Sequence, residues 1–236
     1  MASLKILSGG AAQGLVGHLS AAFRTETGLD IEGAFGAVGA MADRLREGQA
    51  ADIVILTQAL VAKLGEERLI SASTAKNVGA VETALAVRSN DPLVSVPDQA
   101  ALRAVLLASD AIYIPDTAAS TAGIHVARML AQLGIAHELE GRLKIHPNGA
   151  TAMRHLAQSG AQRPVGCTQA TEIISTPGVK LSGTLPPGCE LATTYTASIA
   201  TRAARPREAH ALIDLLIAPD RRELRALAGF VEPAHP

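Results

Sequence analysis

Short apolar runs alternate along the chain with longer segments in which apolar side chains recur at helical spacing. The apolar runs predict strands over residues 3–8, 29–35, 52–56, 80–88, 111–114, 142–146, 164–167, 179–185 and 191–201. The helical spacing predicts helices over residues 12–27, 38–48, 57–67, 97–108, 120–133, 149–159, 205–217 and 219–228. Because strands and helices alternate, we expect an α/β fold with mostly parallel sheets. We also expect helices to end at Gly28, Gly48, Gly134 and Gly160.

Two of the predicted strands, 80–88 and 191–201, are longer than the others, and neither is followed at once by a helix. A chain that crosses from one lobe to another and later returns needs two such strands. We therefore expect two lobes, each a mostly parallel sheet flanked by helices. Lobe one would comprise residues 1–84 and 193–236, lobe two would comprise 85–192, and a ligand cleft would lie between them.

Four turns between a predicted strand and a predicted helix are rich in small residues, two in each expected lobe. Helix N-termini present unpaired backbone N–H groups beyond the carboxyl ends of strands, and glycine lets the backbone approach a ligand closely. One such turn alone is an ordinary joint, with Ser120 or Asn148 as a helix cap. Four together predict a small-anion site. Its contacts would be Ser8, Gly9, Gly10, Ala11, Ala37, Val38, Ser120, Thr121, Ala122, Asn148 and Gly149.

The charge balance narrows the classes of partner. The chain carries 21 Lys and Arg against 22 Asp and Glu, which leaves no basic footprint for nucleic acid or an anionic membrane. No apolar stretch approaches the roughly 18 residues of a membrane span. The start, "MASLKIL", lacks the basic and apolar regions of a secretory signal. We expect a cytoplasmic protein as the sequence stands, or a periplasmic one if this is a mature form without its signal peptide.

The two cysteines, Cys167 and Cys189, do not have the spacing of a metal site. A disulfide between them is an open alternative if the chain is exported. We expect no metal and no cofactor.

Three stretches resemble one protein family. They are "FRTETGLDIEGAFGAVGAMADRLREGQAADIVILT", "DTAASTAGIHVARMLAQLGI" and the closing "RPREAHALIDLLIAPDRRELRALAGF". In this order they are similar to the molybdate-binding proteins of ABC transporters, over nearly the whole chain. The resemblance implies a two-lobed fold of the type II periplasmic-binding-protein kind, a small-molecule anion as ligand and, if the chain is exported, an ABC permease as partner.

The ligand positions depart from the molybdate pattern. The resemblance places Ala11, and Ala37 or Val38, where that family has hydroxyl side chains, and Cys167 where it has a tyrosine. An oxyanion would then lose hydrogen bonds, at about 1–3 kcal/mol for each unpaired group. Lobe two instead offers neutral groups, among them Thr168 and Gln169, which suit an organic carboxylate. Additional acid, base or anion contacts would be Glu82, Arg88, His125 and His146.

Several functions remain open from the sequence. The first is a solute-binding protein for an organic carboxylate, and the second is an isomerase of unsaturated tricarboxylates, since some similar proteins are of the aconitate isomerase type. An isomerase would need a base, donors for the developing charge and contacts to carboxylates. A third is a molybdate or tungstate binder with an altered site. A cytoplasmic sensor ranks last because no DNA-binding helix pair is visible.

Overall fold

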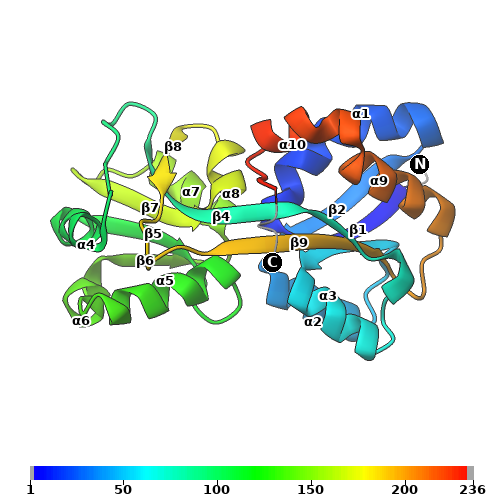
Figure 1. Ribbon diagram of the computed structural model, residues 1–236, viewed down its shortest axis with the longest axis horizontal. Helices are drawn as coiled ribbons and strands as arrows, with labels where there is room; N and C mark the ends of the chain where they lie inside the picture. The colour runs from blue at the N-terminus through cyan, green and yellow to red at the C-terminus, as the bar shows by residue number, and fades with distance from the viewer. Residues whose placement is uncertain (1–2, 233–236) are drawn as a thin grey trace. The chain divides into compact units, whose positions relative to one another are not determined.

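The computed structural model describes residues 3–232 (Figure 1). Its strands are β1 Ser3–Gly9, β2 Asp30–Gly36, β3 Ile53–Thr57, β4 Lys76–Arg88, β5 Ala111–Pro115, β6 Leu143–His146, β7 Pro164–Gln169, β8 Val179–Thr184 and β9 Ala192–Ile199. Its α-helices are α1 Gln13–Thr27, α2 Val38–Arg46, α3 Gln58–Glu66, α4 Gln99–Ala108, α5 Thr121–Gln132, α6 Ala136–Leu139, α7 Gly149–Ala157, α8 Ala170–Ile174, α9 Pro206–Ile217 and α10 Arg222–Leu227. Short 3-10 turns are η1 Gly10–Ala12, η2 Ala72–Thr74, η3 Glu140–Arg142 and η4 Pro219–Arg221. Within residues 3–232, none of the helices combines the length and the apolar content needed to cross a membrane.

The chain divides into two compact units. The first contains the residues up to Val81 and those from Thr193 onward, and the second is Glu82–Ala192. β4 and β9 each run from one unit into the other. From the sequence, the boundaries were expected between residues 84 and 85 and between residues 192 and 193.

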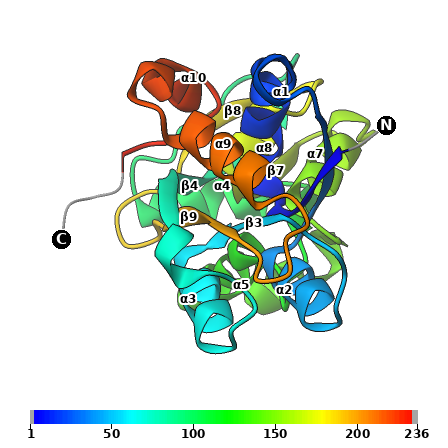
Figure 2. The same cartoon turned by 90° about the vertical axis from the view of Figure 1, so that its right-hand side faces the viewer.

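In the first unit, β1 is the middle of three parallel strands, with β2 on one side and β3 on the other. β9 extends this sheet and is antiparallel to β3. All five residues of β3, "IVILT", are buried, as expected for a strand covered on both faces. Figure 2 shows α1 and α9 on one side of these strands and α2 and α3 on the other.

In the second unit, β5 lies between β6 and β7 and is parallel to both. β4 is antiparallel to β7 and to β8. One face of this sheet packs against α4, α5 and α6 through a buried apolar core. The other face packs against α7, where a Cβ atom at Gly166 would lie 2.4 Å from Met153 Cε.

The sheets are mostly parallel, as expected, apart from the long strands β4 and β9, which run antiparallel to their neighbours β7 and β3. One expectation needs correction. Gly160 does not end a helix: α7 ends at Ala157, whereas Gly28, Gly48 and Gly134 take the expected positive φ of 73°, 87° and 67°. The short helices α6 and α8 were not predicted, since four or five residues are too few to establish a period.

Candidate functional site

In the first unit, β1 and β2 end side by side, and the predicted turns that follow them meet. The two strands pair with Gly9 opposite Gly36, so both carboxyl ends lie at one edge of the sheet. A Cβ atom at Gly9 would lie 2.7 Å from Val38 Cγ1 and 2.9 Å from Tyr195 Cε1, closer than side chains approach. A glycine at position 9 is therefore required for the turn after β1 to lie against the start of α2.

The predicted contact residues in these turns of the first unit offer no free side-chain donor. Ser8 is fully buried and its hydroxyl donates to Gly9 O at 2.9 Å, so this hydroxyl serves the turn itself. The N-cap residues of α1 and α2 are Ala12 and Ala37, whose methyl groups cannot cap a helix. The remaining predicted contacts of this turn are buried in η1: Gly10 and Ala11.

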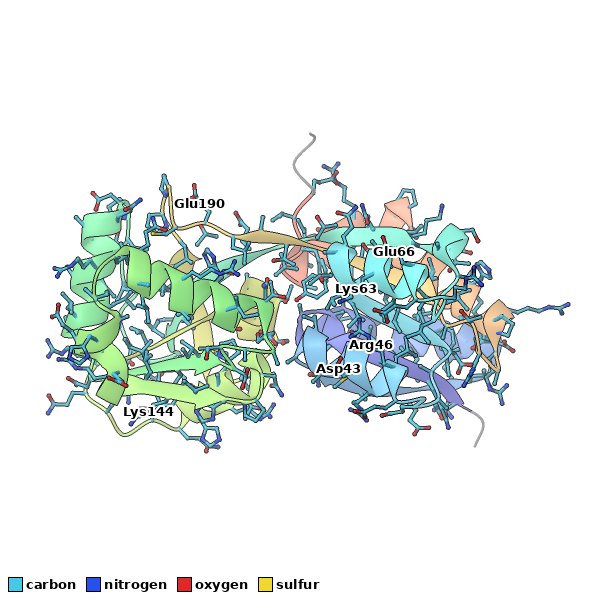
Figure 3. The ribbon with its side chains drawn as sticks, turned by 90° about the horizontal axis from the view of Figure 1, so that it is seen from below. Asp43, Arg46, Lys63, Glu66, Lys144 and Glu190 are labelled. Atoms are coloured by element: carbon cyan, nitrogen blue, oxygen red, sulfur yellow. The ribbon has the colours of Figure 1, made fainter. Side chains whose placement is uncertain are left out.

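A hollow of about 510 Å³ in the first unit lies elsewhere, at the ends of α2 and α3 and the turn after β9. Its lining includes Arg46, which donates two hydrogen bonds to Glu67 and one to Asp43. Figure 3 shows Asp43 and Arg46 together on α2. Because this arginine is already neutralised and none of the predicted contacts lines the hollow, we do not place the ligand here.

In the second unit, the turn between β5 and α5 is closed by Asp116. The N–H groups of Ala118 and Ala119 donate to Asp116 Oδ1 at 2.8 and 2.7 Å. These hydrogen bonds hold the pKa of Asp116 below its ordinary value. A Cβ atom at Gly123 would lie 2.1 Å from Asp116 O, so the first turn of α5 packs directly on this loop.

The N-terminus of α5 keeps its backbone donors. Ser120 is the N-cap residue, yet its side chain makes no capping hydrogen bond. The first N–H group to bond within the helix is that of Ile124, which donates to Ser120 O at 2.9 Å. The N–H groups of Thr121, Ala122 and Gly123 come before it and have no partner within the helix. They and the positive end of the helix dipole can therefore serve a negatively charged group.

The fourth predicted turn, between β6 and α7, is capped by the chain itself. Asn148 is the N-cap residue, and its Oδ1 accepts a hydrogen bond from Thr151 N–H at 2.9 Å. A Cβ atom at the next residue, Gly149, would lie 1.9 Å from Glu172 Oε2. Only a glycine therefore lets the start of α7 approach this carboxyl group.

The carboxyl group of Glu172 accepts hydrogen bonds from groups that the sequence suggests as ligand contacts. Glu172 is 5% exposed, and Thr168 donates its hydroxyl hydrogen to Glu172 Oε2 at 2.6 Å. Backbone N–H groups of Gly149, Ala150 and Gln169 donate to the same carboxyl group. Burial raises the pKa of Glu172 above its ordinary value, and these hydrogen bonds offset part of the rise. The acidic group at the N-terminus of α7 is thus a side chain of this protein.

Three buried polar side chains near the carboxyl end of β7 lack partners. β4 and β7 place Thr83 and Gln169 directly opposite each other, and these residues are 1% and 3% exposed. Among residues 3–232, no hydrogen bond reaches Thr83 Oγ1, Gln169 Nε2 or Gln169 Oε1. The same holds, within the described chain, for the buried hydroxyl of Thr171 at the start of α8. Buried polar groups in native proteins are normally paired, so these unpaired groups are candidates for contact with a ligand.

Thr83 and Gln169 lie on the face of the sheet that α5 covers. Side chains alternate between faces along a strand, so the pair Leu85 and Cys167, two residues away, shares this face. That pair belongs to a core cluster with residues of α5. Thr168 points to the opposite face, toward Glu172. The amide of Gln169 and the open N-terminus of α5 therefore belong to one side, and Glu172 belongs to the other.

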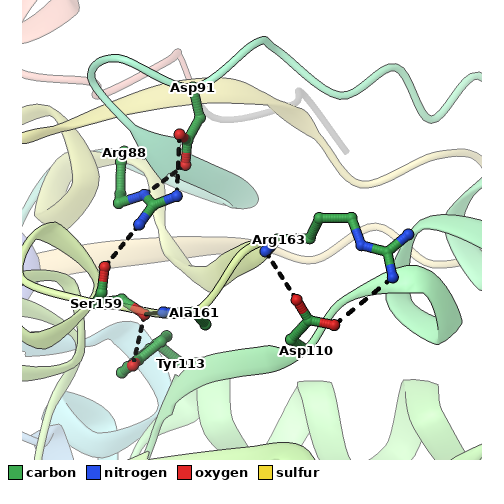
Figure 4. A network of polar contacts seen from close by, with 7 residues as sticks. All are labelled: Arg88, Asp91, Asp110, Tyr113, Ser159, Ala161 and Arg163. Atoms are coloured by element: carbon green, nitrogen blue, oxygen red, sulfur yellow. Dashed lines mark hydrogen bonds and ion pairs between the residues drawn. The ribbon is translucent and has the colours of Figure 1, made fainter.

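Arg88 is engaged far from this cluster. Its guanidinium donates to both carboxylate oxygens of Asp91, at 2.6 and 3.1 Å, and to Ser159 O at 2.6 Å (Figure 4). The hydroxyl of Ser159 in turn accepts from Tyr113. Because β4 is antiparallel to β7, Arg88 lies toward the amino end of β7, whereas Gln169 is at the carboxyl end.

Of the two predicted histidines, His125 has a hydrogen-bond partner, whereas the buried Nε2 of His146 has none within residues 3–232. His125 Nε2 lies 2.8 Å from Cys189 O. The ring of His146 stacks on Tyr113 and on His155, with centroid distances of 5.9 and 4.2 Å. Burial, followed by the neighbouring His155, lowers the pKa of His146.

The cysteines and Glu82 complete the predicted set. Cys167 and Cys189 are both free and buried, which answers the open question of a disulfide. Burial raises the pKa of the Cys167 thiol to about 12, so this thiol stays protonated at neutral pH. Glu82 opens the second unit, is partly buried and precedes Thr83. Within residues 3–232, no three His, Cys, Asp or Glu side chains gather as metal ligands.

Two residues were missed by sequence reasoning: Glu172 and Thr171. The available signal was the spacing in "CTQATEII", which puts an acid four residues after Thr168. The ligand roles suggested from the sequence, for these turns and for the charged residues alike, stay predictions.

Comparison with known proteins identifies relatives of the whole chain. A family model described as bacterial extracellular solute-binding protein matches residues 4–231. The chain is 25% identical over 227 residues to an aconitate isomerase from Pseudomonas sp, and the match covers 92% of this chain and 83% of that protein.

Solved structures show the same fold. The periplasmic molybdate-binding protein of Azotobacter vinelandii is 18% identical, with a TM-score of 0.83 over 98% of this chain and 100% of the other. The sulfate-binding protein SubI of Mycobacterium tuberculosis H37Rv is 18% identical, with a TM-score of 0.74 over 99% of this chain and 88% of the other. These likenesses confirm the periplasmic-binding-protein fold and the resemblance to molybdate-binding proteins.

Proposed function

Because this chain belongs to the bacterial extracellular solute-binding protein family, we propose that it binds a small organic carboxylate with the side-chain amide of Gln169 in direct contact. The observation that carries the proposal is the buried amide, which has no partner for its Nε2 or Oε1 within the described chain. A carboxylate accepts hydrogen bonds from such an amide and from the N–H groups at a helix N-terminus.

One feature favours a carboxylate over a metal oxyanion. The resemblance to molybdate binders implies a hydroxyl side chain at position 37 or 38, but this chain has Ala37, the N-cap residue of α2, and Val38, its first residue. The turns at Gly9 and Val38 remain predicted ligand contacts through their backbone.

The proposal is tested by a thermal-shift panel on the purified protein. The panel contains molybdate, tungstate, sulfate and phosphate beside citrate, trans-aconitate, malate and succinate. A ligand at about a hundred times its Kd adds about 2.7 kcal/mol to the free energy of unfolding, which a melting curve resolves. We expect the largest shifts from carboxylates. A large shift from molybdate or tungstate alone would show an oxyanion binder with an altered site.

Two variants test whether Gln169 contacts the carboxylate that the panel identifies. Gln169→Met removes the amide at nearly constant length, and we expect affinity for the carboxylate to fall about tenfold or more, since a hydrogen bond to a charged group contributes about 1.5–3 kcal/mol. Gln162→Met is the matched control, because Gln162 is exposed before the amino end of β7. An unchanged affinity in Gln169→Met would remove Gln169 from the site.

The second candidate is an isomerase of unsaturated tricarboxylates, which the aconitate isomerase relative favours. Moving a double bond requires a base close to the bound acid. Glu82, next to Thr83, is the acidic side chain that we assign to this role under the second candidate. Proton NMR of the protein with cis- or trans-aconitate over hours distinguishes the two candidates: a binder leaves the acid unchanged and an isomerase interconverts the isomers.

Partner and compartment are part of the proposal. We propose that an exported form delivers its ligand to an ABC permease, as the family description suggests. Fractionation of cells that produce the native protein tests the compartment. Recovery in the cytoplasm would instead favour the enzyme candidate.

A further inference from the structure

The buried amide of Gln169 leaves both of its ends unpaired. Nε2 is a donor and Oε1 is an acceptor, and neither has a hydrogen-bond partner among residues 3–232. Because both ends lack partners, this observation does not depend on which way the amide is turned. A single ligand that pairs with both ends of the Gln169 amide must therefore both accept and donate a hydrogen bond.

The surroundings of Gln169 leave its side chain without a partner in the described chain. Its strand partner Thr83 lies directly opposite on β4, but the Thr83 hydroxyl does not pair with the amide. The backbone N–H of Gln169 is bonded to the Glu172 carboxyl group, which fixes the start of α8. Gln169 thus has a fixed backbone and a side chain whose hydrogen-bonding capacity is unused by the described chain.

Different anions meet this requirement to different degrees. Molybdate and sulfate are fully deprotonated at neutral pH and present only acceptors, so they pair with Nε2 and leave Oε1 unpaired. A carboxylate without a hydroxyl group, such as succinate, also leaves Oε1 unpaired. An acid that carries a hydroxyl beside its carboxylate pairs with both ends, since the hydroxyl hydrogen is donated to Oε1.

We propose that the ligand is a hydroxycarboxylate. Its carboxylate accepts from Gln169 Nε2 and from the N-terminus of α5, and its hydroxyl donates to Gln169 Oε1. This inference rests on the proposed function and adds the substrate class. A site that hydrogen-bonds a ligand hydroxyl rejects the analogue without it, because a buried acceptor is then left unpaired.

The test compares acids that differ by one hydroxyl group. Titration calorimetry on the full chain measures Kd for lactate against propionate, malate against succinate, and citrate against tricarballylate. In at least one pair we expect the hydroxy acid to bind about tenfold or more tightly than its partner. In Gln169→Met we expect that ratio to fall below about threefold, and in the control Gln162→Met we expect it to persist.

The outcomes separate this inference from the function on which it rests. Equal affinity within every pair would leave a carboxylate binder and overturn the hydroxyl contact. Binding of molybdate but of none of the acids, or no binding at all, would overturn both. A ratio that persists in Gln169→Met would overturn the assignment to this residue. The wild-type ratios need no variant, so they decide the ligand class even if Gln169→Met fails to fold.

The same titrations distinguish this inference from the enzyme candidate. Aconitates carry three carboxylates and no hydroxyl, so they cannot donate to Gln169 Oε1. We expect trans-aconitate to bind about tenfold more weakly than citrate. Tighter binding of trans-aconitate would contradict the hydroxycarboxylate assignment and favour the isomerase.

Discussion

Thr168 donates its hydroxyl hydrogen to Glu172 Oε2 at 2.6 Å, directly beside Gly149 at the start of α7. Through this hydrogen bond, and through backbone N–H groups at the start of α7, the chain surrounds its own carboxyl group with donors. The N–H groups of Gly149 and Ala150, in a turn that looks like a ligand site in sequence, therefore already have an acceptor within the chain. The N–H groups of Thr121, Ala122 and Gly123, at the start of α5, have no partner within their helix.

We expect Glu172→Gln to lower the free energy of unfolding by about 1–3 kcal/mol, because the new amide NH₂ group faces donors instead of accepting from them. Urea unfolding measures the loss. Glu66→Gln is the control, since Glu66 is exposed on α3. Equal stability of wild type and Glu172→Gln would mean that this carboxyl group does not organise the turn.

The stability lost in Glu172→Gln should also depend on pH. Since burial raises the folded-state pKa of Glu172, its stabilising contribution is full below the ordinary glutamate pKa of about 4.3 and declines as pH rises through the folded value. The difference between wild type and Glu172→Gln should therefore shrink toward higher pH. A difference that grows with pH would indicate a lowered pKa instead.

Gly149→Ala should destabilise the protein by about 1–3 kcal/mol, the usual cost of overpacking, because its Cβ atom would lie 1.9 Å from Glu172 Oε2. The matched control is Gly17→Ala in α1, where the added carbon meets no atom within 4 Å. There we expect a gain of about 0.5–1 kcal/mol from helix propensity. Chemical denaturation of both variants measures the contrast, and similar effects at the two sites would refute the close approach.

Arg88→Met should lower the melting temperature and leave ligand affinity unchanged. The arginine joins Asp91 to the carbonyl of Ser159, so its loss removes hydrogen bonds that close this end of the sheet. The control is Arg163→Met. The Arg163 side chain is 67% exposed, and its ion pair with Asp110, 3.6 Å long, contributes little to stability because it lies at the surface. Loss of carboxylate binding in Arg88→Met, with the fold intact, would instead assign this arginine to the ligand.

Acid should weaken the β5–α5 turn through Asp116. Hydrogen bonds from Ala118 and Ala119 hold its pKa low, so its contribution is present above the ordinary Asp pKa of about 3.9 and is lost as pH falls through the folded value. We expect Asp116→Asn to be less stable than wild type at neutral pH. We also expect it to lose less stability than wild type between about pH 5 and pH 3. Melting curves across this range test it, and parallel pH profiles would count against it.

The fold was largely predictable because its signals are local. Each of the nine predicted strand positions holds a strand, and Gly28, Gly48 and Gly134 end helices as expected. The direction of β4 and β9 was not predictable, because an apolar run has the same pattern in a parallel and an antiparallel sheet. Four small-residue turns look alike in sequence, and only the structure shows that Glu172 accepts hydrogen bonds from the one at the start of α7.

The carboxyl group of Glu172 is tethered, and this bears on how many solute molecules one chain can hold. A group attached to the chain has an effective concentration of millimolar or above at its own binding partners, so a dissolved acid competes poorly for the start of α7. The N-termini of α5 and α7 have similar sequences, but they are therefore not two equivalent binding sites. With the start of α7 served by Glu172, we expect the second unit to bind one acid, and a saturating titration should end at a single equivalent per chain.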